Sequence, residues 1–353
     1  MNINAAVIGC GNISQYHFSG LEKCGARVSW VCDINQEAAK PWMTKFNARF
    51  TEDYRKIIAD PEVNTVVVTL LSGLHKDICT AAIAAGKAVI CEKTLAENPA
   101  DAWEICTAAQ IKGTILYTSY MKRFIPAVEK AKELIPGLGR ILSTYIRAYQ
   151  CWGDLWSKTP TSGAFYTPPG GSSKITKKYG GGILVCGGSH ILDLVLFLIG
   201  RPHRLFASVY EPAGQDYDLQ ASALMETAER GIVYYEALAH PLKKIGYLRD
   251  GWDERVEING INGRLEIYSP VWSDHTAKGS LLVHYDNVTG NTTEYRFNPI
   301  SPFDKAVEFF CNGIKKGEQG TQSVFTGYEV DELIEHIKLS SKSKKAVDIT
   351  WRN

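Results

Sequence analysis

The chain of 353 residues is longer than one hydrophobic core normally supports, which predicts two domains. A hydrophobic fraction of 45% with 22% charged residues is typical of a soluble globular protein, and a formal net charge of +1 gives no reason to expect nucleic acid or an anionic membrane as partner. No basic segment of a signal peptide precedes the first apolar run, and no apolar stretch approaches the roughly 20 residues that span a bilayer. The nine cysteines lack metal-like spacing, so we expect a cytoplasmic protein without a metal site.

Strand and helix patterns alternate from the N-terminus to Tyr120. The predicted strands are Asn4–Gly9, Arg27–Cys32, Thr65–Leu70, Ala88–Cys91 and Thr114–Thr118, and the helices between them are Ile13–Cys24, Glu37–Phe46, Asp77–Ala85 and Ala100–Lys112. Short apolar strands that alternate with helices predict a parallel sheet covered on both faces.

After Tyr120 the pattern changes to one helix and one strand, then an irregular stretch, and then a series of strands. The irregular stretch runs from Tyr149 to Gly182 and is rich in Gly, Pro, Ser and aromatic residues. The remaining elements are predicted at Pro126–Ile135, Arg140–Arg147, Ile183–Ile199, Leu205–Tyr210, Gln220–Thr227, Gly231–Ala239, Arg255–Asn259, Gly263–Tyr268, Ser280–Tyr285, Thr292–Phe297, Phe303–Lys316 and Gly327–Lys342. Such strands are typical of an open, mostly antiparallel sheet.

A glycine-rich turn joins the first predicted strand to the first helix. In this turn Gly9 permits the tight bend, and Gly11 lets the backbone approach a pyrophosphate. Asn12 and Ile13 then lead into the helix, whose N-terminus offers free N–H groups to an anion. Ser14 stands where the full signature has a third glycine and is small enough for close helix–strand packing. The turn predicts a dinucleotide site.

Asp33 ends the second strand, 22 residues beyond Gly11, at the spacing of a carboxylate that binds ribose hydroxyls. This carboxylate would repel a 2′-phosphate, and the residues at 34–36 (Ile, Asn, Gln) supply no cation for one, so NAD is favoured over NADP. The alternative is an ordinary βα turn with a solvated aspartate. We predict an α/β protein with an NAD-binding, doubly wound Rossmann domain at 1–122 and a C-terminal α/β domain with the open sheet at 123–353.

Five segments, in the same order, resemble the Gfo/Idh/MocA oxidoreductase family nearly from end to end. They are His75–Ile78 with Ala84–Lys87, Glu92–Thr94 (similar to E-K-P), Tyr120–Pro126, Gly181–Asp193 (similar to G-G-x-x-x-D-x-G-x-H-x-x-D) and Arg255–Ile267. The resemblance implies hydride transfer between a nicotinamide and a hydroxyl-bearing carbon of a sugar, inositol or related polyol. It also implies a C-terminal sheet that forms dimer or tetramer contacts, so we expect a homo-oligomer.

The same resemblance assigns roles to individual residues. By matching position, Lys93 is the catalytic lysine and His190 the catalytic histidine. Glu92 is expected to hold the cofactor. The nicotinamide half of the cofactor is expected to be lined by Leu71, Ser72 and His75.

Three departures from the family pattern bear on these roles. Thr94 replaces a proline whose peptide bond is characteristically cis, and Leu71 and Ser72 replace Pro-Asn. Cys186 replaces an aspartate, four residues before His190, that commonly joins the catalytic set. The proton relay is therefore expected to differ from that of relatives.

Oxidation of a secondary alcohol needs a base within about 3 Å of the hydroxyl. A histidine has an ordinary pKa near neutrality, so our hypothesis makes His190 the base or relay and lets Lys93 hydrogen-bond the substrate oxygen. The alternatives are a solvated Lys93 and a structural His190. Asp193 either orients the ligand or caps its own helix, and Cys186 is either a packed small residue or a nucleophile.

Aromatic side chains gather in the irregular stretch of 34 residues from Tyr149 to Gly182. They are Trp152, Trp156, Phe165, Tyr166 and Tyr179. Aromatic rings beside a site stack on sugar faces or on a flat aglycone, whereas the alternative is that they pack the loop against its own domain or a neighbouring subunit.

Three functions remain open from the sequence. The first is an NAD-dependent sugar, glycoside or cyclitol dehydrogenase, or a related oxidoreductase whose cofactor stays tightly bound. The second is redox-assisted glycoside cleavage, in which a transient ketone acidifies the neighbouring C–H and elimination follows. The third is a non-catalytic NAD-binding sensor.

Overall fold

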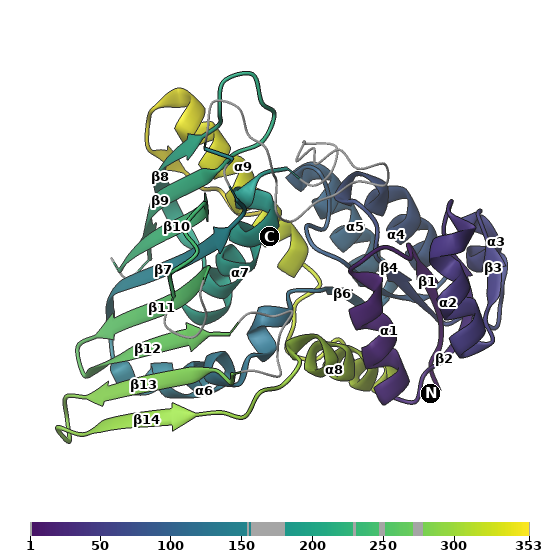
Figure 1. The fold of residues 1–353 in the computed structure, drawn as a ribbon, viewed down its shortest axis with the longest axis horizontal. Coiled ribbons are helices and arrows are strands. Elements are labelled where there is room, and N and C mark those ends of the chain that lie inside the picture. Colours follow the sequence, from purple (N-terminus) through teal and green to yellow (C-terminus); the bar gives the residue numbers. More distant parts are fainter. Residues whose placement is uncertain are drawn as a thin grey trace. The chain divides into compact units, whose positions relative to one another are not determined.

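The structure is a computed structural model that describes residues 2–153, 155–156, 181–228, 231–246, 251–270 and 278–352 (Figure 1). The chain forms two compact units, one of Met1–Met121 with Pro302–Glu332 and one of Lys122–Ser301 with Leu333–Asn353. The sequence predicts 302–332 as part of the second domain (123–353), whereas the structure assigns this segment to the first unit. The return of the chain to the first unit leaves no mark in the local apolar pattern, so it is visible only in the structure.

The first unit is built on a six-stranded parallel sheet in the order β3-β2-β1-β4-β5-β6. Its elements are β1 (Asn4–Ile8), α1 (Ser14–Lys23), β2 (Arg27–Cys32), α2 (Gln36–Phe46), β3 (Arg49–Thr51), α3 (Tyr54–Ala59), β4 (Thr65–Val68), η1 (Ser72–Leu74), α4 (His75–Ala84), β5 (Ala88–Cys91), α5 (Pro99–Lys112) and β6 (Leu116–Thr118). The strand order reverses between β1 and β4, and ligands of doubly wound sheets bind at the carboxyl ends of the strands beside such a point. The predicted doubly wound sheet is confirmed.

The two returning helices complete this unit. α8 (Pro302–Lys316) packs along α1 so closely that a Cβ on Gly20 would lie 2.5 Å from the Cβ of Val307. The first turn of α9 (Thr326–Ser343) places Tyr328 in the core that α4 and α5 form with the sheet. The fold of the N-terminal domain therefore depends on a segment from the far end of the chain.

The second unit contains a nine-stranded sheet in the order β14-β13-β12-β11-β7-β10-β9-β8-β15. Its pairs are antiparallel except for β7 with β10. Its elements are η2 (Met121–Phe124), α6 (Pro126–Leu134), η3 (Ile135–Leu138), β7 (Ile141–Cys151), η5 (Leu184–Gly188), α7 (Ser189–Leu198), β8 (Pro202–Tyr210), β9 (Gln220–Thr227), β10 (Ile232–His240), β11 (Trp252–Gly260), β12 (Gly263–Ser269), β13 (Leu281–Asp286), β14 (Thr292–Arg296), the last turns of α9, and β15 (Val347–Asp348).

Helices cover one face of this sheet. α6 packs on β12 and β13, α7 packs on β7, and Ser340 of α9 accepts a hydrogen bond from the Ala207 N–H of β8 (Figure 1). The other face exposes side chains at alternate positions, such as Tyr234 beside the buried Tyr235 on β10. The open, mostly antiparallel sheet is confirmed. Among the described residues, no helix has both the length and the apolar character needed to cross a membrane.

Candidate active site

The glycine-rich turn follows β1 in the first unit. Gly9 has φ +100°, and a Cβ there would lie 2.7 Å from the Thr69 carbonyl oxygen, so only glycine fits. Gly11 and Asn12 are exposed, and a Cβ on Gly11 would meet open space. α1 begins after Ile13 without a side-chain cap and without an acidic residue in its first turn. The turn and the helix N-terminus therefore present backbone N–H groups to an anion, as a pyrophosphate requires.

Asp33 lies beside this turn, because its Oδ2 accepts a hydrogen bond of 2.7 Å from the Cys10 N–H. Its Oδ1 accepts from the Asn35 N–H at 2.8 Å, so both oxygens have fixed positions while their remaining lone pairs can accept ribose hydroxyls. Arg49 of the neighbouring β3 is paired with Asp60 at 2.5 Å. The residues present therefore fit a dinucleotide with a free 2′-hydroxyl. Burial, with the charge of Asp33, raises the pKa of the Cys10 thiol to about 12, so this cysteine stays neutral.

The carboxyl end of β5 carries Glu92, Lys93 and Thr94. Glu92 is buried, and its Oε1 lies 2.7 Å from Nε2 of His17 on α1. Its Oε2 accepts a hydrogen bond of 3.1 Å from the Lys93 N–H. The Lys93–Thr94 peptide bond is cis, the geometry that the family resemblance attaches to proline at this position. Lys93 is half-buried.

Two of the departures from the family pattern contact each other. The hydroxyls of Ser72 and Thr94 lie 2.9 Å apart, which joins the start of η1 to the turn after β5. His75 strengthens the same junction, because its Nδ1 lies 3.1 Å from the Thr94 carbonyl oxygen and its Nε2 lies 3.0 Å from that of Leu70. The His75 ring is fully buried, and burial lowers its pKa. His75 thus supports this turn, while Leu71 and Ser72 are half-buried where η1 begins, after β4.

In the second unit, His190 lies in the first turn of α7, directly after the π-helical turn η5. Its side chain is buried, whereas Cys186 is exposed on that turn. Asp193 is fully buried and receives a bidentate ion pair from Arg123 of η2, with Nε–Oδ2 at 2.8 Å and Nη2–Oδ1 at 2.6 Å. The ion pair with Arg123 is an additional role, beyond the ligand orientation or helix capping predicted for Asp193. It joins η2 to α7 and so fixes the helix that carries His190.

Two glycines of the Gly181–Asp193 segment, Gly182 and Gly188, are explained by close packing around η5. A Cβ on Gly182 would lie 2.1 Å from the Asp218 carbonyl oxygen, and one on Gly188 would lie 2.2 Å from the Tyr235 hydroxyl. Asp218 also accepts a hydrogen bond of 2.8 Å from the Leu184 N–H, and burial raises its pKa to about 6. Asp218 supports the turn from a distant part of the chain, and no motif around it in the sequence marks this role.

The aromatic residues predicted to bind substrate divide into two groups. Trp152 is buried and donates a hydrogen bond of 3.2 Å to the Gln150 side chain. Trp156 stacks on Tyr210 with ring centroids 5.0 Å apart and donates to the Ala239 carbonyl at 2.5 Å. Both rings thus pack against their own unit. The other three lie outside the described residues: Phe165, Tyr166 and Tyr179.

Comparisons with known proteins agree along most of the chain. The model of an oxidoreductase family with an NAD-binding Rossmann fold matches residues 3–120, and the model of the GFO/IDH/MocA C-terminal domain matches residues 129–266. Inositol 2-dehydrogenase of Burkholderia ambifaria (strain MC40-6) is 25% identical over 341 residues, which cover 93% of this chain and 90% of the relative. D-xylose 1-dehydrogenase (NADP(+)) 2 of Haloferax volcanii is 25% identical and covers 84% of this chain and 83% of its own. A solved levoglucosan dehydrogenase in complex with NADH and L-sorbose shares the fold, with a TM-score of 0.82, 21% identity and 100% coverage of both chains.

Proposed function

This chain belongs to the Gfo/Idh/MocA oxidoreductase family, and we propose that it is an NAD-dependent dehydrogenase that oxidises a secondary hydroxyl of a sugar, glycoside or cyclitol to a ketone. The names of the inositol and xylose dehydrogenases among its relatives support this substrate class. The observation that carries the proposal is the turn after β5. There the buried Glu92 and the half-buried Lys93 stand at the carboxyl end of a strand in the sheet whose first turn suits a dinucleotide.

Each part of the reaction is assigned to residues of this chain. The N–H groups at Gly11, Asn12 and Ile13 bind the pyrophosphate, and the carboxylate of Asp33 accepts hydrogen bonds from the ribose hydroxyls. NAD, when bound, supplies the acceptor for the hydride that leaves the carbinol carbon. Leu71 lines the cofactor site at the end of β4.

We assign the removal of the hydroxyl proton to His190 of the second unit. His190 takes this proton or passes it on, and Lys93 donates a hydrogen bond to the substrate oxygen and holds it in place. Cys186 stands where the family pattern has an aspartate, so the proton that His190 takes up passes to solvent without a carboxylate at this position.

The first test joins a nucleotide assay with a substrate screen. The purified protein is denatured, the released nucleotide is identified, and the intact protein is screened with sugars, glycosides and cyclitols at 340 nm. NADH that accumulates with one sugar class supports the proposal. Retained NAD with a free sugar released from a glycoside would instead identify redox-assisted cleavage, and retained NAD without any turnover would identify a sensor.

Two variants test the assignment of the chemistry. Lys93→Ala and His190→Ala are each expected to lower kcat by at least about a hundredfold, the usual contribution of a positioned acid–base group. Retained turnover in both variants would contradict the assignment.

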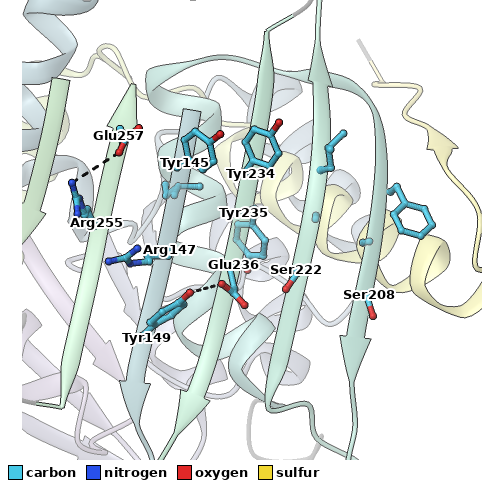
Figure 2. A pocket seen from close by; sticks show the side chains of 15 residues that line it. Tyr145, Arg147, Tyr149, Ser208, Ser222, Tyr234, Tyr235, Glu236, Arg255 and Glu257 are labelled. Atoms are coloured by element: carbon cyan, nitrogen blue, oxygen red, sulfur yellow. Dashed lines mark hydrogen bonds and ion pairs between the residues drawn. The ribbon is translucent and has the colours of Figure 1, made fainter. Parts of the chain in front are cut away.

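We also propose that the exposed face of the second sheet joins copies of this chain in the cytoplasm. A hollow of about 560 Å³ lies on this face, and Tyr145 and Tyr234 stack beside it with ring centroids 4.5 Å apart (Figure 2). Phe206 is 48% exposed and Tyr145 is 46% exposed, and exposed apolar groups that gather on one face mark association surfaces. Light scattering should report an oligomer for the natural chain and a smaller species for Tyr234→Arg. A natural chain that is monomeric at micromolar concentration would contradict this proposal.

A further inference from the structure

We propose that His17 is a positioning residue of this enzyme, which fixes the orientation and the charge of the Glu92 carboxylate beside Lys93. The inference rests on the proposed function and deepens it, because it adds a residue outside the motifs to the support of the cofactor site. His17 lies on α1, one helical turn after the glycine-rich loop.

The contact between His17 and Glu92 is buried on every side. The His17 side chain is fully buried, that of Glu92 is 5% exposed, and Nε2 lies 2.7 Å from Oε1. A carboxylate only accepts hydrogen bonds, so Nε2 carries the proton and donates it. The ring of Phe303 on α8 meets the His17 ring edge-on, with centroids 6.2 Å apart. His17 is therefore held between β5 and α8.

Both oxygens of Glu92 are occupied by donors that define its direction. Oε1 accepts from His17 and Oε2 accepts from the Lys93 N–H at 3.1 Å. Burial by itself raises the pKa of Glu92, but the His17 hydrogen bond, followed by the charges of His17 and Lys93 and by the Lys93 N–H, outweighs burial and leaves the pKa lowered. Without His17, the strongest effect that opposes burial would be lost. The pKa of Glu92 would then rise, and Glu92 would take up a proton at higher pH.

Packing alone does not account for a histidine at this position. The Nδ1 atom of His17 is buried and has no hydrogen-bond partner among the described residues. An unpaired buried polar atom costs stability, so an apolar side chain would fill the same space at lower cost. What an apolar side chain cannot supply is the N–H that meets Glu92.

The other titratable groups near Glu92 do not replace this donor. They are Lys93 on the same turn, Cys91 on β5 and His75 on α4. On the far side of His17, α8 contributes the apolar side chain of Phe303. The nitrogens of His75 face backbone carbonyls, and burial raises the pKa of Cys91 and keeps it neutral. The ionised state of Glu92 thus depends on His17 and Lys93.

An ionised Glu92 near the cofactor favours the positively charged NAD⁺ over the neutral NADH. The first experiment measures the dissociation constants of both nucleotides at pH 5.5 to 8.5. In His17→Leu the preference for NAD⁺ should fall by about tenfold at neutral pH and recover as the pH rises. His17→Gln, whose amide can donate from a similar place, should stay within about threefold of the natural protein.

A second measurement needs no cofactor and separates this inference from the proposed function. In folded His17→Leu the pKa of Glu92 is expected to lie above its ordinary value. The free energy of unfolding of this variant should therefore decrease as pH rises from the ordinary pKa through the raised one, whereas His17→Gln should follow the natural protein. Phe18→Leu is the matched control, because Phe18 is a fully buried neighbour on α1 whose ring stacks on Trp42. It should lower stability equally at every pH.

The outcomes are distinct. A pH-dependent difference between His17→Leu and His17→Gln supports the inference even if the protein binds no nucleotide, a result that would remove only the proposed function. If His17→Leu lowers stability by the same amount at every pH and leaves the NAD⁺ to NADH ratio unchanged, His17 serves packing and the inference is overturned. Should His17→Leu not fold, Glu92→Gln replaces it in the binding test and must show the lowered NAD⁺ preference without any pH dependence.

Discussion

Asp218 is the buried acid beneath η5, the turn that precedes His190, and its replacement by asparagine should make the protein more stable at alkaline pH. Burial raises the pKa of Asp218 from 3.8 to about 6, so the folded state resists its ionisation. A group with a raised folded pKa contributes stability that is complete below the unfolded pKa and is lost as pH rises through the folded one. For Asp218 this loss extends from about pH 4 to about pH 7.

The magnitude follows from the size of this displacement. At roughly 1.4 kcal/mol per pH unit, ionising Asp218 in the folded state costs about 3 kcal/mol. Asparagine cannot ionise, and its side-chain oxygen can still accept the hydrogen bond from Leu184, which is 2.8 Å in the natural protein. We therefore expect Asp218→Asn to gain about 1–3 kcal/mol relative to the natural chain at pH 8 and to gain little at pH 5.

The assay is urea-induced unfolding at pH 5, 6, 7 and 8, with the midpoint and the m value fitted at each pH. Asp218→Ala is the control, because it removes the ionisable group together with the acceptor for Leu184 and should be less stable than Asp218→Asn at every pH. A difference between Asp218→Asn and the natural protein that does not change from pH 5 to pH 8 would refute the assigned pKa and the reasoning built on it.

Three more substitutions test other contacts of the molecule. Arg123→Ala removes the bidentate cation from the buried Asp193 carboxylate and should lower the free energy of unfolding by about 3–5 kcal/mol, measured by urea unfolding; a loss below about 1 kcal/mol would show that this ion pair is not needed. Gly188→Ala should destabilise the protein and lower kcat, because its Cβ would lie 2.2 Å from the Tyr235 hydroxyl, and Tyr235→Phe in the same chain should restore part of both. Asp33→Ser should raise the ratio of kcat/KM for NADP to that for NAD by at least about tenfold, and an unchanged ratio would remove Asp33 from ribose recognition.

The parts of the molecule that the sequence predicted are those encoded by short local patterns. The turn from Gly9 to Ile13 and the carboxylate at Asp33 follow from spacing alone, and the structure brings them together through the hydrogen bond between Cys10 and Asp33. Alternation of apolar strands and helices likewise predicted the six-stranded sheet, apart from the three-residue β3 and the six-residue α3, which are too short to show a period.

The rest depends on pairs of residues that are distant in the sequence. His17 and Glu92 are separated by 75 positions, and Arg123 and Asp193 by 70, so neither pair leaves a local signature. The same holds for Asp218, which meets the turn before His190 only because β9 packs beneath that turn. A histidine or an aspartate in such a place is indistinguishable from a solvated one until the fold is known.

Thr94 shows how a local departure can be understood through its partner. The family pattern has proline there, and the sequence alone does not show the effect of the change. In the structure the peptide bond to Thr94 is cis, and the Thr94 hydroxyl contacts that of Ser72, another departure from the pattern, at 2.9 Å. The two replacements therefore belong to one contact, which the sequence alone presents as unrelated changes.

The most direct test of the central claim is the absorbance at 340 nm when the purified protein and NAD are mixed with a panel of sugars, glycosides and cyclitols. We expect NADH to accumulate with at least one member of the panel, and we expect Lys93→Ala to abolish this signal while the protein stays folded. An equal rate in Lys93→Ala, or NADH formation with none of the panel by a protein that binds NAD, would contradict the central claim.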